Sequence, residues 1–398
     1  MIESNVAPKK PFSFTRHEFA AFALFLATSL SLAWMAYSFG GVDFGVYYAA
    51  GRVMLNGGNP YDYSQLAGEI VSSTGALNNP FYYAPWFAWA MSVLALLPYE
   101  FARLCWAVVN VGLWYWGLFN LSKLIEWPPA GWRRWGAYLF ATIIFAWSTW
   151  GSEQVGVTIL FLVTVLLLSY QQSRQILTGF FMALILFKPN VTGFPGLVLA
   201  AWLISRREWK PVISMIVSLS GFLVISLFVS PGWYLALTQP DKLTGLSYTL
   251  NENGAAQTLR YVSTLPGWLA SYGVTGVFAC VIYVFAALLG IIFTICLVKK
   301  SKDMTALTAY SFLVNFALTP YALFYDYSVL VVTLFYLNAR LSLRPMLTRL
   351  QRLMNGLAIA SLFVGDNISF RYWIVVIFVL AGIGLLSDVS RSASSQTG

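Results

Sequence analysis

The sequence predicts an all-α, polytopic membrane protein with about 12 transmembrane helices, and three observations support this fold class. Hydrophobic residues make up 59% of the 398 residues, and the mean hydropathy is +0.69. Only 10% of the residues are charged, whereas a soluble globular domain carries roughly 25%. The net charge of +9 comes largely from lysine and arginine in short loops between apolar segments. This distribution is typical of cytoplasmic loops and argues against a nucleic-acid-binding surface.

The first predicted element is a retained transmembrane helix. Residues 1–17 are polar and partly basic, and Glu18–Phe39 is a mostly apolar run, long enough to cross a hydrocarbon core of ~30 Å. No small-residue cleavage site follows, so we expect a membrane helix and not a removable signal peptide. The N-terminus is then expected in the cytoplasm and the next loop outside.

Residues 40–80 form the first predicted external loop. It begins with a lone carboxylate, Asp43, which is followed by the aromatic residues Tyr47 and Tyr48. Residues 56–60 predict a turn, because asparagine and glycine tolerate a positive φ and proline fixes the backbone. We therefore predict a structured loop with one carboxylate where an apolar segment meets water, and we expect the active site there.

Twelve further apolar segments follow. They are predicted at residues 81–97, 101–122, 135–150, 154–170, 175–187, 190–205, 211–229, 270–298, 304–319, 326–339, 353–364 and 371–388. From residue 123 onward, successive loops lie on alternate sides of the membrane if every basic loop is on the cytoplasmic side.

Two segments lie between the external loop and residue 123, but the alternation requires an odd number of crossings there. Either segment 81–97, which contains Pro85 and precedes Pro98, lies in the interface or re-enters, or the basic loop at 123–134 breaks the rule. We prefer the first alternative, which gives twelve crossings with both termini inside. The second long external loop is then residues 231–268.

Three charged residues on the expected outer face are candidates for chemistry. Asp43 suits a general base toward a substrate hydroxyl, and the alternative is a solvated residue at a helix end. Lys188, between two apolar segments, suits the phosphate of an anionic headgroup, unless it only extends to the interface. Asp326, in an aromatic-rich break, suits a ligand of sugar hydroxyls, and the alternative is a buried hydrogen-bonded acid.

Two other polar stretches are predicted outside. The loop around residues 247–261 contains Asn251, Glu252 and Arg260; it is either a plain loop or a site where Arg260 pairs with a phosphate through its planar guanidinium. Glu153 and Gln154 are predicted to open a helix. A carboxylate at a helix N-terminus favours the helix dipole, which explains the glutamate but leaves the glutamine without a role.

No cofactor or metal site is predicted. The three cysteines lie inside apolar segments without ligand spacing and are expected to be small hydrophobic residues. The single histidine, His17, lies in the N-terminal tail, and no nucleotide-binding motif is present.

Several short motifs occur in a characteristic order between residues 43 and 330. They are Asp43–Ala50 with Gly57–Asp62, Phe81–Trp86 leading to Leu97–Pro98, Gln154, Gly179–Pro189, Asn251–Arg260, Thr319–Tyr321 and Tyr325–Asp326. With these motifs, the chain resembles glycosyltransferase family 87, membrane enzymes of the GT-C superfamily whose best-known members are polyprenol-phosphate-mannose-dependent mannosyltransferases.

The resemblance implies a GT-C fold and transfer of a hexose, with mannose as the first candidate, from a polyprenyl-phosphate-linked donor with inversion. Asp43 would be the base, and Lys188 with Arg260 would bind the donor phosphate. The sugar and the acceptor would contact Tyr47, Tyr48, Tyr82, Tyr83, Gln154, Asn251, Glu252, Tyr325 and Asp326. The acceptor would be a glycolipid or polysaccharide, and the enzyme would work among membrane lipids on the periplasmic or extracellular side of a bacterial plasma membrane.

The chain departs from the family pattern at two places. Mannosyl-transferring members can carry a histidine-bearing motif after the proline that corresponds to Pro320, whereas this chain has Tyr325 and Asp326 there. The first loop has one acid and not a paired Asp-x-Asp, so the resemblance does not imply a metal.

Two other classes of protein have a similar number of helices. A multi-pass lipid or solute transporter or flippase should show internal repeats and broken helices at mid-depth, and the sequence shows no convincing repeat. A structural membrane protein would leave the external acid, lysine and arginine unexplained. The enzyme is therefore the preferred interpretation.

Overall fold

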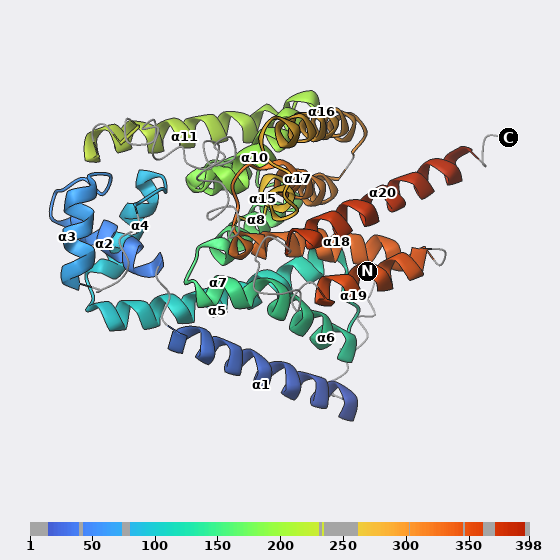
Figure 1. Ribbon diagram of the computed structural model, residues 1–398, viewed down its shortest axis with the longest axis horizontal. Coiled ribbons are helices and arrows are strands. Elements are labelled where there is room, and N and C mark those ends of the chain that lie inside the picture. Colours follow the sequence, from blue (N-terminus) through green and yellow to red (C-terminus); the bar gives the residue numbers. More distant parts are fainter. Residues whose placement is uncertain are drawn as a thin grey trace, which may run out of the picture.

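The computed structural model describes residues 15–39, 43–73, 80–230, 233–234, 262–301, 303–344, 347–360 and 371–394. Within these ranges all regular structure is helical, which confirms the predicted all-α class. Helix α1 lies along one edge of the molecule and α11 along the opposite edge, while α2, α3 and α4 gather at one end (Figure 1).

The helices have the following bounds. In the first half they are α1 (Arg16–Phe39), α2 (Asp43–Leu55), α3 (Tyr63–Ser73), α4 (Pro85–Ala95), α5 (Tyr99–Ile125), α6 (Trp132–Ala141), the π-helical η1 (Thr142–Ala146), α7 (Trp147–Gly151), α8 (Gly156–Gln171), α9 (Gln175–Leu184) and the 3₁₀ turn η2 (Ile185–Phe187). In the second half they are α10 (Pro189–Ser205), α11 (Trp209–Val229), α15 (Leu265–Ser271), α16 (Gly276–Lys300), α17 (Met304–Leu318), the 3₁₀ helix η4 (Phe324–Leu330), α18 (Val331–Ser342), α19 (Thr348–Ala360) and α20 (Trp373–Ser394).

Four described helices, α1, α5, α11 and α16, are long and apolar enough to cross a membrane. Helices α11 and α16 expose most of their large apolar side chains, as expected for surfaces that face lipid. Several other helices are apolar but shorter. The membrane character is therefore supported, while twelve crossings remain a prediction.

The first predicted external loop is helical. Helix α2 packs against both α3 and α4, and the tightest approach is at Gly51. A Cβ atom at Gly51 would lie 2.8 Å from the carbonyl group of Met91, so only glycine lets α2 and α4 come this close. This packing fixes the direction of α2, whose first residue is Asp43.

Helix α4 occupies the segment whose crossing was in question. It has 11 residues, about 16 Å at ~1.5 Å per residue, which is roughly half the thickness of a hydrocarbon core. Pro85 begins the helix, and its side chains pack largely inside the protein. The short length of α4 and the burial of its side chains both agree with a segment that does not cross the membrane by itself.

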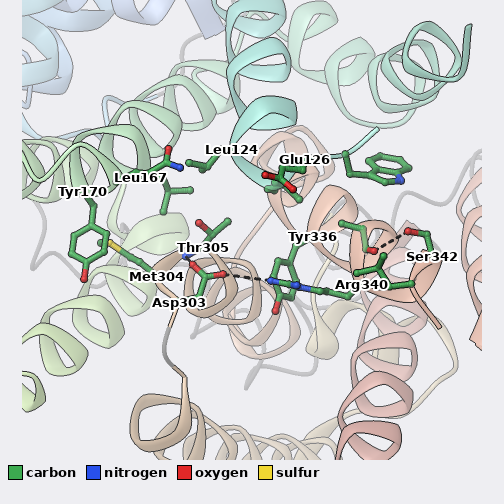
Figure 2. A pocket seen from close by; sticks show the side chains of 15 residues that line it. Leu124, Glu126, Leu167, Tyr170, Asp303, Met304, Thr305, Tyr336, Arg340 and Ser342 are labelled. Carbon is green, nitrogen blue, oxygen red and sulfur yellow. Dashed lines mark hydrogen bonds and ion pairs between the residues drawn. The ribbon is translucent and has the colours of Figure 1, made fainter. Parts of the chain in front are cut away.

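The other end of the bundle collects the basic helix ends. The C-terminal ends of α5, α8 and α18 and the start of α17 surround a cavity of about 400 Å³, which Glu126, Tyr170, Asp303 and Arg340 help to line (Figure 2). A guanidinium nitrogen of Arg206 donates to the Ser301 carbonyl over 2.7 Å at the same end. The opposite helix ends carry the acidic and aromatic residues described next.

Candidate functional site

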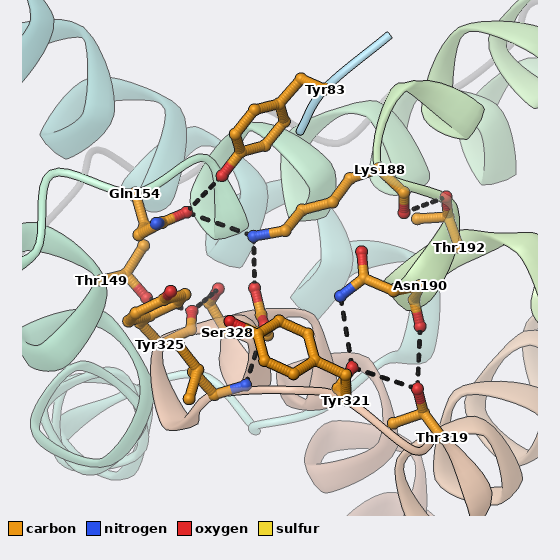
Figure 3. A network of polar contacts seen from close by, with 12 residues as sticks. Tyr83, Thr149, Gln154, Lys188, Asn190, Thr192, Thr319, Tyr321, Tyr325 and Ser328 are labelled. Carbon is orange, nitrogen blue, oxygen red and sulfur yellow. Dashed lines mark hydrogen bonds and ion pairs between the residues drawn. The ribbon is translucent and has the colours of Figure 1, made fainter. Parts of the chain in front are cut away.

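Four segments far apart in the sequence meet at one end of the bundle. They are the start of α2 with Asp43, the turn before α8 with Gln154, the junction of η2 and α10 with Lys188, and η4 with Asp326. We refer to these four residues as the polar cluster. Figure 3 shows Lys188 reaching from its junction toward Gln154, with Tyr83 beside both.

The centre of the polar cluster is a buried ion pair. Lys188 Nζ lies 2.6 Å from Asp326 Oδ1, and the two residues are only 7% and 1% exposed. The second carboxylate oxygen of Asp326 accepts from the backbone N–H of Leu323 over 3.0 Å. Both oxygens of Asp326 thus have partners within the protein, which fixes the direction of the lysine.

Gln154 connects this ion pair to Asp43. Its Oε1 lies 3.2 Å from Lys188 Nζ and 2.9 Å from each hydroxyl of Tyr47 and Tyr83. The two hydroxyls are themselves 2.8 Å apart. Because Oε1 is surrounded by donors, the amide N–H₂ is the group left to donate, and the Gln154 side chain lies close enough to Asp43 to lower its pKa.

Asp43 is a partly buried carboxylate at the N-terminus of α2. Burial raises the pKa of Asp43 above its ordinary value, and nearby Asp326 adds to this, while the hydrogen bond from Gln154 and the charge of Lys188 act in the opposite direction. A carboxylate with a raised pKa is a stronger base than a solvated aspartate. The arrangement therefore suits proton abstraction.

Two tyrosines flank the lysine. The ammonium of Lys188 lies 5.3 Å from the ring centre of Tyr83 and 5.4 Å from that of Tyr325. Tyr325 is partly buried and Tyr321 is 39% exposed, so aromatic faces border the polar cluster on its accessible side. Such faces can pack against the C–H surface of a sugar ring.

Close backbone packing holds η4 against α8. A Cβ atom at Gly156 would lie 2.7 Å from the carbonyl oxygen of Tyr325 and would also collide with Oγ of Ser328. The hydroxyl of Thr149 donates to the same Tyr325 carbonyl over 2.8 Å. These contacts fix the backbone next to Asp326 relative to the turn that carries Gln154.

A second set of hydrogen bonds holds the segment before η4 against α10. Asn190 Nδ2 donates to the Tyr321 carbonyl over 3.3 Å, and Asn315 Nδ2 donates to the Asn190 carbonyl over 3.3 Å. Thr319 Oγ1 lies 3.4 Å from the same Asn190 carbonyl (Figure 3). The residues after Lys188 and those before Asp326 are therefore held together.

The prediction that Glu153 caps a helix is wrong. Helix α8 begins at Gly156 and its first turn has no side-chain cap. Glu153 instead has φ = 54° and is 4% exposed, and its Oε1 lies 2.6 Å from Nε of Arg103. Arg103 also donates to the Tyr37 carbonyl over 2.7 Å, so this ion pair joins the end of α1 to the turn that presents Gln154.

The structure places the remaining predicted residues as follows. Tyr48 is buried on another side of α2, where its hydroxyl donates to the Leu97 carbonyl over 2.8 Å. Tyr82 is 46% exposed. Asn251, Glu252 and Arg260 lie outside the described residues. The polar cluster thus brings together Asp43, Gln154, Lys188 and Asp326 and adjoins Tyr47, Tyr83 and Tyr325, whereas Tyr48 points away from it.

Sequence reasoning did not select Arg103, Thr149 or Gly156. Arg103 carried a detectable signal, since it is a charged residue inside the predicted apolar segment 101–122 and such residues are costly unless paired. Glycine and threonine are common in membrane helices, so neither could be singled out without knowing which backbone approaches it.

Comparison with known proteins identifies the family. The family model for glycosyltransferase family 87 matches residues 81–320, more than half of the chain. The matched region contains Gln154 and Lys188, while Asp326 lies shortly after it and Asp43 lies well before it. Searches of curated proteins and of solved structures gave no match. The chain belongs to glycosyltransferase family 87.

Proposed function

We propose that this membrane glycosyltransferase transfers a hexose from a polyprenyl-phosphate-linked donor to an acceptor hydroxyl, with inversion and with Asp43 as the general base. The observation that carries the proposal is the connection of a partly buried Asp43, whose pKa is raised by burial, to the buried Gln154–Lys188–Asp326 network. Four separate segments of the chain contribute to this network, so the fold maintains it at the cost of burying charge.

The reaction assigns one step to each group. Asp43 accepts the proton of the acceptor hydroxyl while the hydroxyl oxygen forms a bond to the anomeric carbon. The bond from that carbon to the donor phosphate oxygen breaks, and the polyprenyl phosphate leaves with the electron pair. Attack opposite to the leaving group inverts the anomeric centre.

The Lys188–Asp326 pair favours a positioning role for both residues. Lys188 was predicted to bind the donor phosphate and Asp326 to bind sugar hydroxyls, but each already holds the other at 2.6 Å. We propose that the pair orients the Gln154 side chain toward Asp43. Because Asp326 neutralises most of the charge of Lys188, the lysine attracts the substrate phosphate only weakly. Tyr321 and Tyr325, at the accessible side, are the better candidates for contact with the sugar ring.

The charge of the polar cluster favours a donor with a single phosphate. Asp43, Lys188 and Asp326 together carry one excess negative charge when all are ionised. This charge repels a pyrophosphate donor more strongly than a donor with a single phosphate, because the pyrophosphate carries more negative charge. The bundle exposes wide apolar surfaces on α11 and α16, which suit a donor that remains in lipid. Mannose is the first candidate sugar, and a glycolipid or polysaccharide is the proposed acceptor.

Membership of a glycosyltransferase family favours the enzyme over the transporter alternative. We further propose a bacterial plasma membrane and an active site on its periplasmic or extracellular side. The basic helix ends gather at the end of the bundle opposite the polar cluster, and basic loops are retained in the cytoplasm.

A panel of donors tests this function. Purified protein in lipid bilayers is incubated with radiolabelled polyprenyl-phosphate mannose, polyprenyl-phosphate glucose or a nucleotide sugar, together with a membrane glycolipid extract. We expect transfer from one polyprenyl-phosphate sugar and none from the nucleotide sugar. Transfer from the nucleotide sugar in lipid free of polyprenyl phosphate would contradict the donor assignment.

A further inference from the structure

In the part of the chain that the structure describes, most positive charges at the site end of the bundle are paired with a carboxylate. Four lysine or arginine side chains lie at this end in the part of the chain that the structure describes: Arg52, Arg103, Lys188 and Arg371. The first three each have a carboxylate partner, at 3.3, 2.6 and 2.6 Å. Arg371 forms no ion pair with any described residue.

Arg371 instead lies on an aromatic ring next to the polar cluster. Its Cζ is 4.2 Å from the ring centre of Phe324, the first residue of η4 and two positions before Asp326. Tyr372, which follows Arg371, is buried and donates to the Ala317 carbonyl over 2.8 Å. The backbone beside Arg371 is thereby fixed at the end of α17, close to the segment that carries Asp326.

No described residue accepts a hydrogen bond from the guanidinium of Arg371. A cation–π contact with the Phe324 ring does not require any of the five N–H donors of the guanidinium. The side chain is partly buried, and no described carboxylate forms an ion pair with it. A partly buried cation without an anionic partner is costly, and a bound anion would remove this cost.

The proposed reaction, on which this inference rests, requires such a cation. A departing phosphate monoester gains negative charge as the anomeric bond breaks, while the polar cluster already carries one excess negative charge. Arginine binds phosphate through two parallel N–H donors, a geometry that lysine lacks. We propose that Arg371 binds the phosphate of the polyprenyl-phosphate donor and product.

Binding measurements test this assignment without turnover. Wild type, Arg371→Gln and Arg371→Lys are placed in bilayers of neutral lipid, and their affinity for polyprenyl phosphate is measured by titration, with polyprenol as the ligand that lacks the phosphate. We expect Arg371→Gln to lose at least about tenfold in affinity for polyprenyl phosphate and none for polyprenol. Arg371→Lys should retain an intermediate affinity, because lysine keeps the positive charge but lacks the two parallel N–H donors.

A matched control is available at the other end of the bundle. Arg206 also lies over an aromatic ring, 4.4 Å from the centre of Trp202, so Arg206→Gln removes a similar cation–π pair without affecting the proposed phosphate site. This control should bind polyprenyl phosphate as wild type does. A thermal midpoint of ligand-free Arg371→Gln equal to or above that of wild type shows that the variant is folded.

The outcomes separate this inference from the proposed function. Equal affinity of wild type and Arg371→Gln for polyprenyl phosphate would overturn the role of Arg371 and leave the donor class standing. Equal affinity of wild type for polyprenyl phosphate and polyprenol would contradict the donor class itself. Competition by phosphatidylglycerol at the same concentration would identify a general lipid headgroup site and overturn the donor assignment.

Discussion

At the scale of single residues, opposing effects act on the pKa of Asp43. Burial raises its pKa, and the Gln154 amide and the charge of Lys188 limit this rise. A base that works near neutral pH must ionise there but still hold a proton strongly. The environment of Asp43 meets both conditions better than a solvated aspartate, whose ordinary pKa is about 3.9.

The raised pKa predicts how stability depends on pH. Because folding favours protonated Asp43, the wild type loses stability as the pH rises from the ordinary aspartate range through the raised pKa. Asparagine does not titrate, so the thermal midpoint of Asp43→Asn should exceed that of wild type increasingly with pH above about 4. Thermal unfolding in detergent between pH 4 and pH 8 checks this. A constant difference across the range would show that the pKa of Asp43 is not shifted.

The buried ion pair predicts a large cost for removing one partner. Lys188→Met leaves Asp326 buried without a counter-ion and should destabilise the protein by about 3–5 kcal/mol, as measured by denaturant unfolding. The double variant Lys188→Met/Asp326→Asn should recover part of this loss. Arg52→Met is the control, since Arg52 is 43% exposed in its pair with Glu69 and should cost about 0–1 kcal/mol. Equal losses of stability for Lys188→Met and Arg52→Met would mean that the Lys188–Asp326 pair is effectively solvated.

At the scale of elements, the site depends on the close approach of η4 and α8. The Tyr325 carbonyl accepts from Thr149 and lies where a side chain on Gly156 would have to be. A small displacement of η4 would move Asp326 and, through Lys188, the hydrogen bond to Gln154. Packing of backbone against backbone therefore determines the geometry of the polar cluster.

Gly156→Ala tests this dependence. The added methyl group should cost about 1–3 kcal/mol through overpacking and reduce the rate of transfer, because η4 must shift. Gly112→Ala is the control: no atom lies within 4 Å of a Cβ at this position in α5, so alanine should be neutral or slightly stabilising. Unfolding and transfer assays on both variants check this. Wild-type activity in Gly156→Ala would show that the site tolerates movement of η4.

The sequence was informative for helices and less so for contacts between them. Apolar runs predicted the positions of α1, α5, α11 and α16, because long lipid-facing helices need continuous hydrophobicity. Lys188 and Asp326 were each selected as candidates, but their pairing links positions 138 residues apart and depends on how α10 and η4 pack. Glu153 was misassigned for the same reason, since its partner Arg103 lies on another helix.

At the scale of the whole molecule, the two ends of the bundle differ in character. The polar cluster and its tyrosines occupy one end, and the basic helix ends with the cavity near Asp303 occupy the other. Bilayers retain basic loops on the cytoplasmic side. The two ends are therefore expected on opposite sides of the membrane.

Cysteine labelling tests this orientation. The three cysteines, Cys105, Cys280 and Cys296, are free and are first replaced by alanine. Ser72→Cys on α3 and Gln172→Cys after α8 then introduce single exposed thiols at the two ends. In intact cells, a membrane-impermeant maleimide should label Ser72→Cys and should reach Gln172→Cys only after permeabilisation. Labelling of both thiols in intact cells would contradict the topology.

The role of Asp43 as base is the central claim, and the transfer rate of Asp43→Asn tests it most directly. The substitution keeps the shape of the side chain and removes the base. Asp62→Asn is the matched control, because Asp62 accepts from the Ser64 backbone N–H at the start of α3 over 2.9 Å and asparagine caps helices as well. With the active donor, we predict at least about a hundredfold loss of rate for Asp43→Asn and a wild-type rate for Asp62→Asn. Equal rates for wild type and Asp43→Asn would contradict the account.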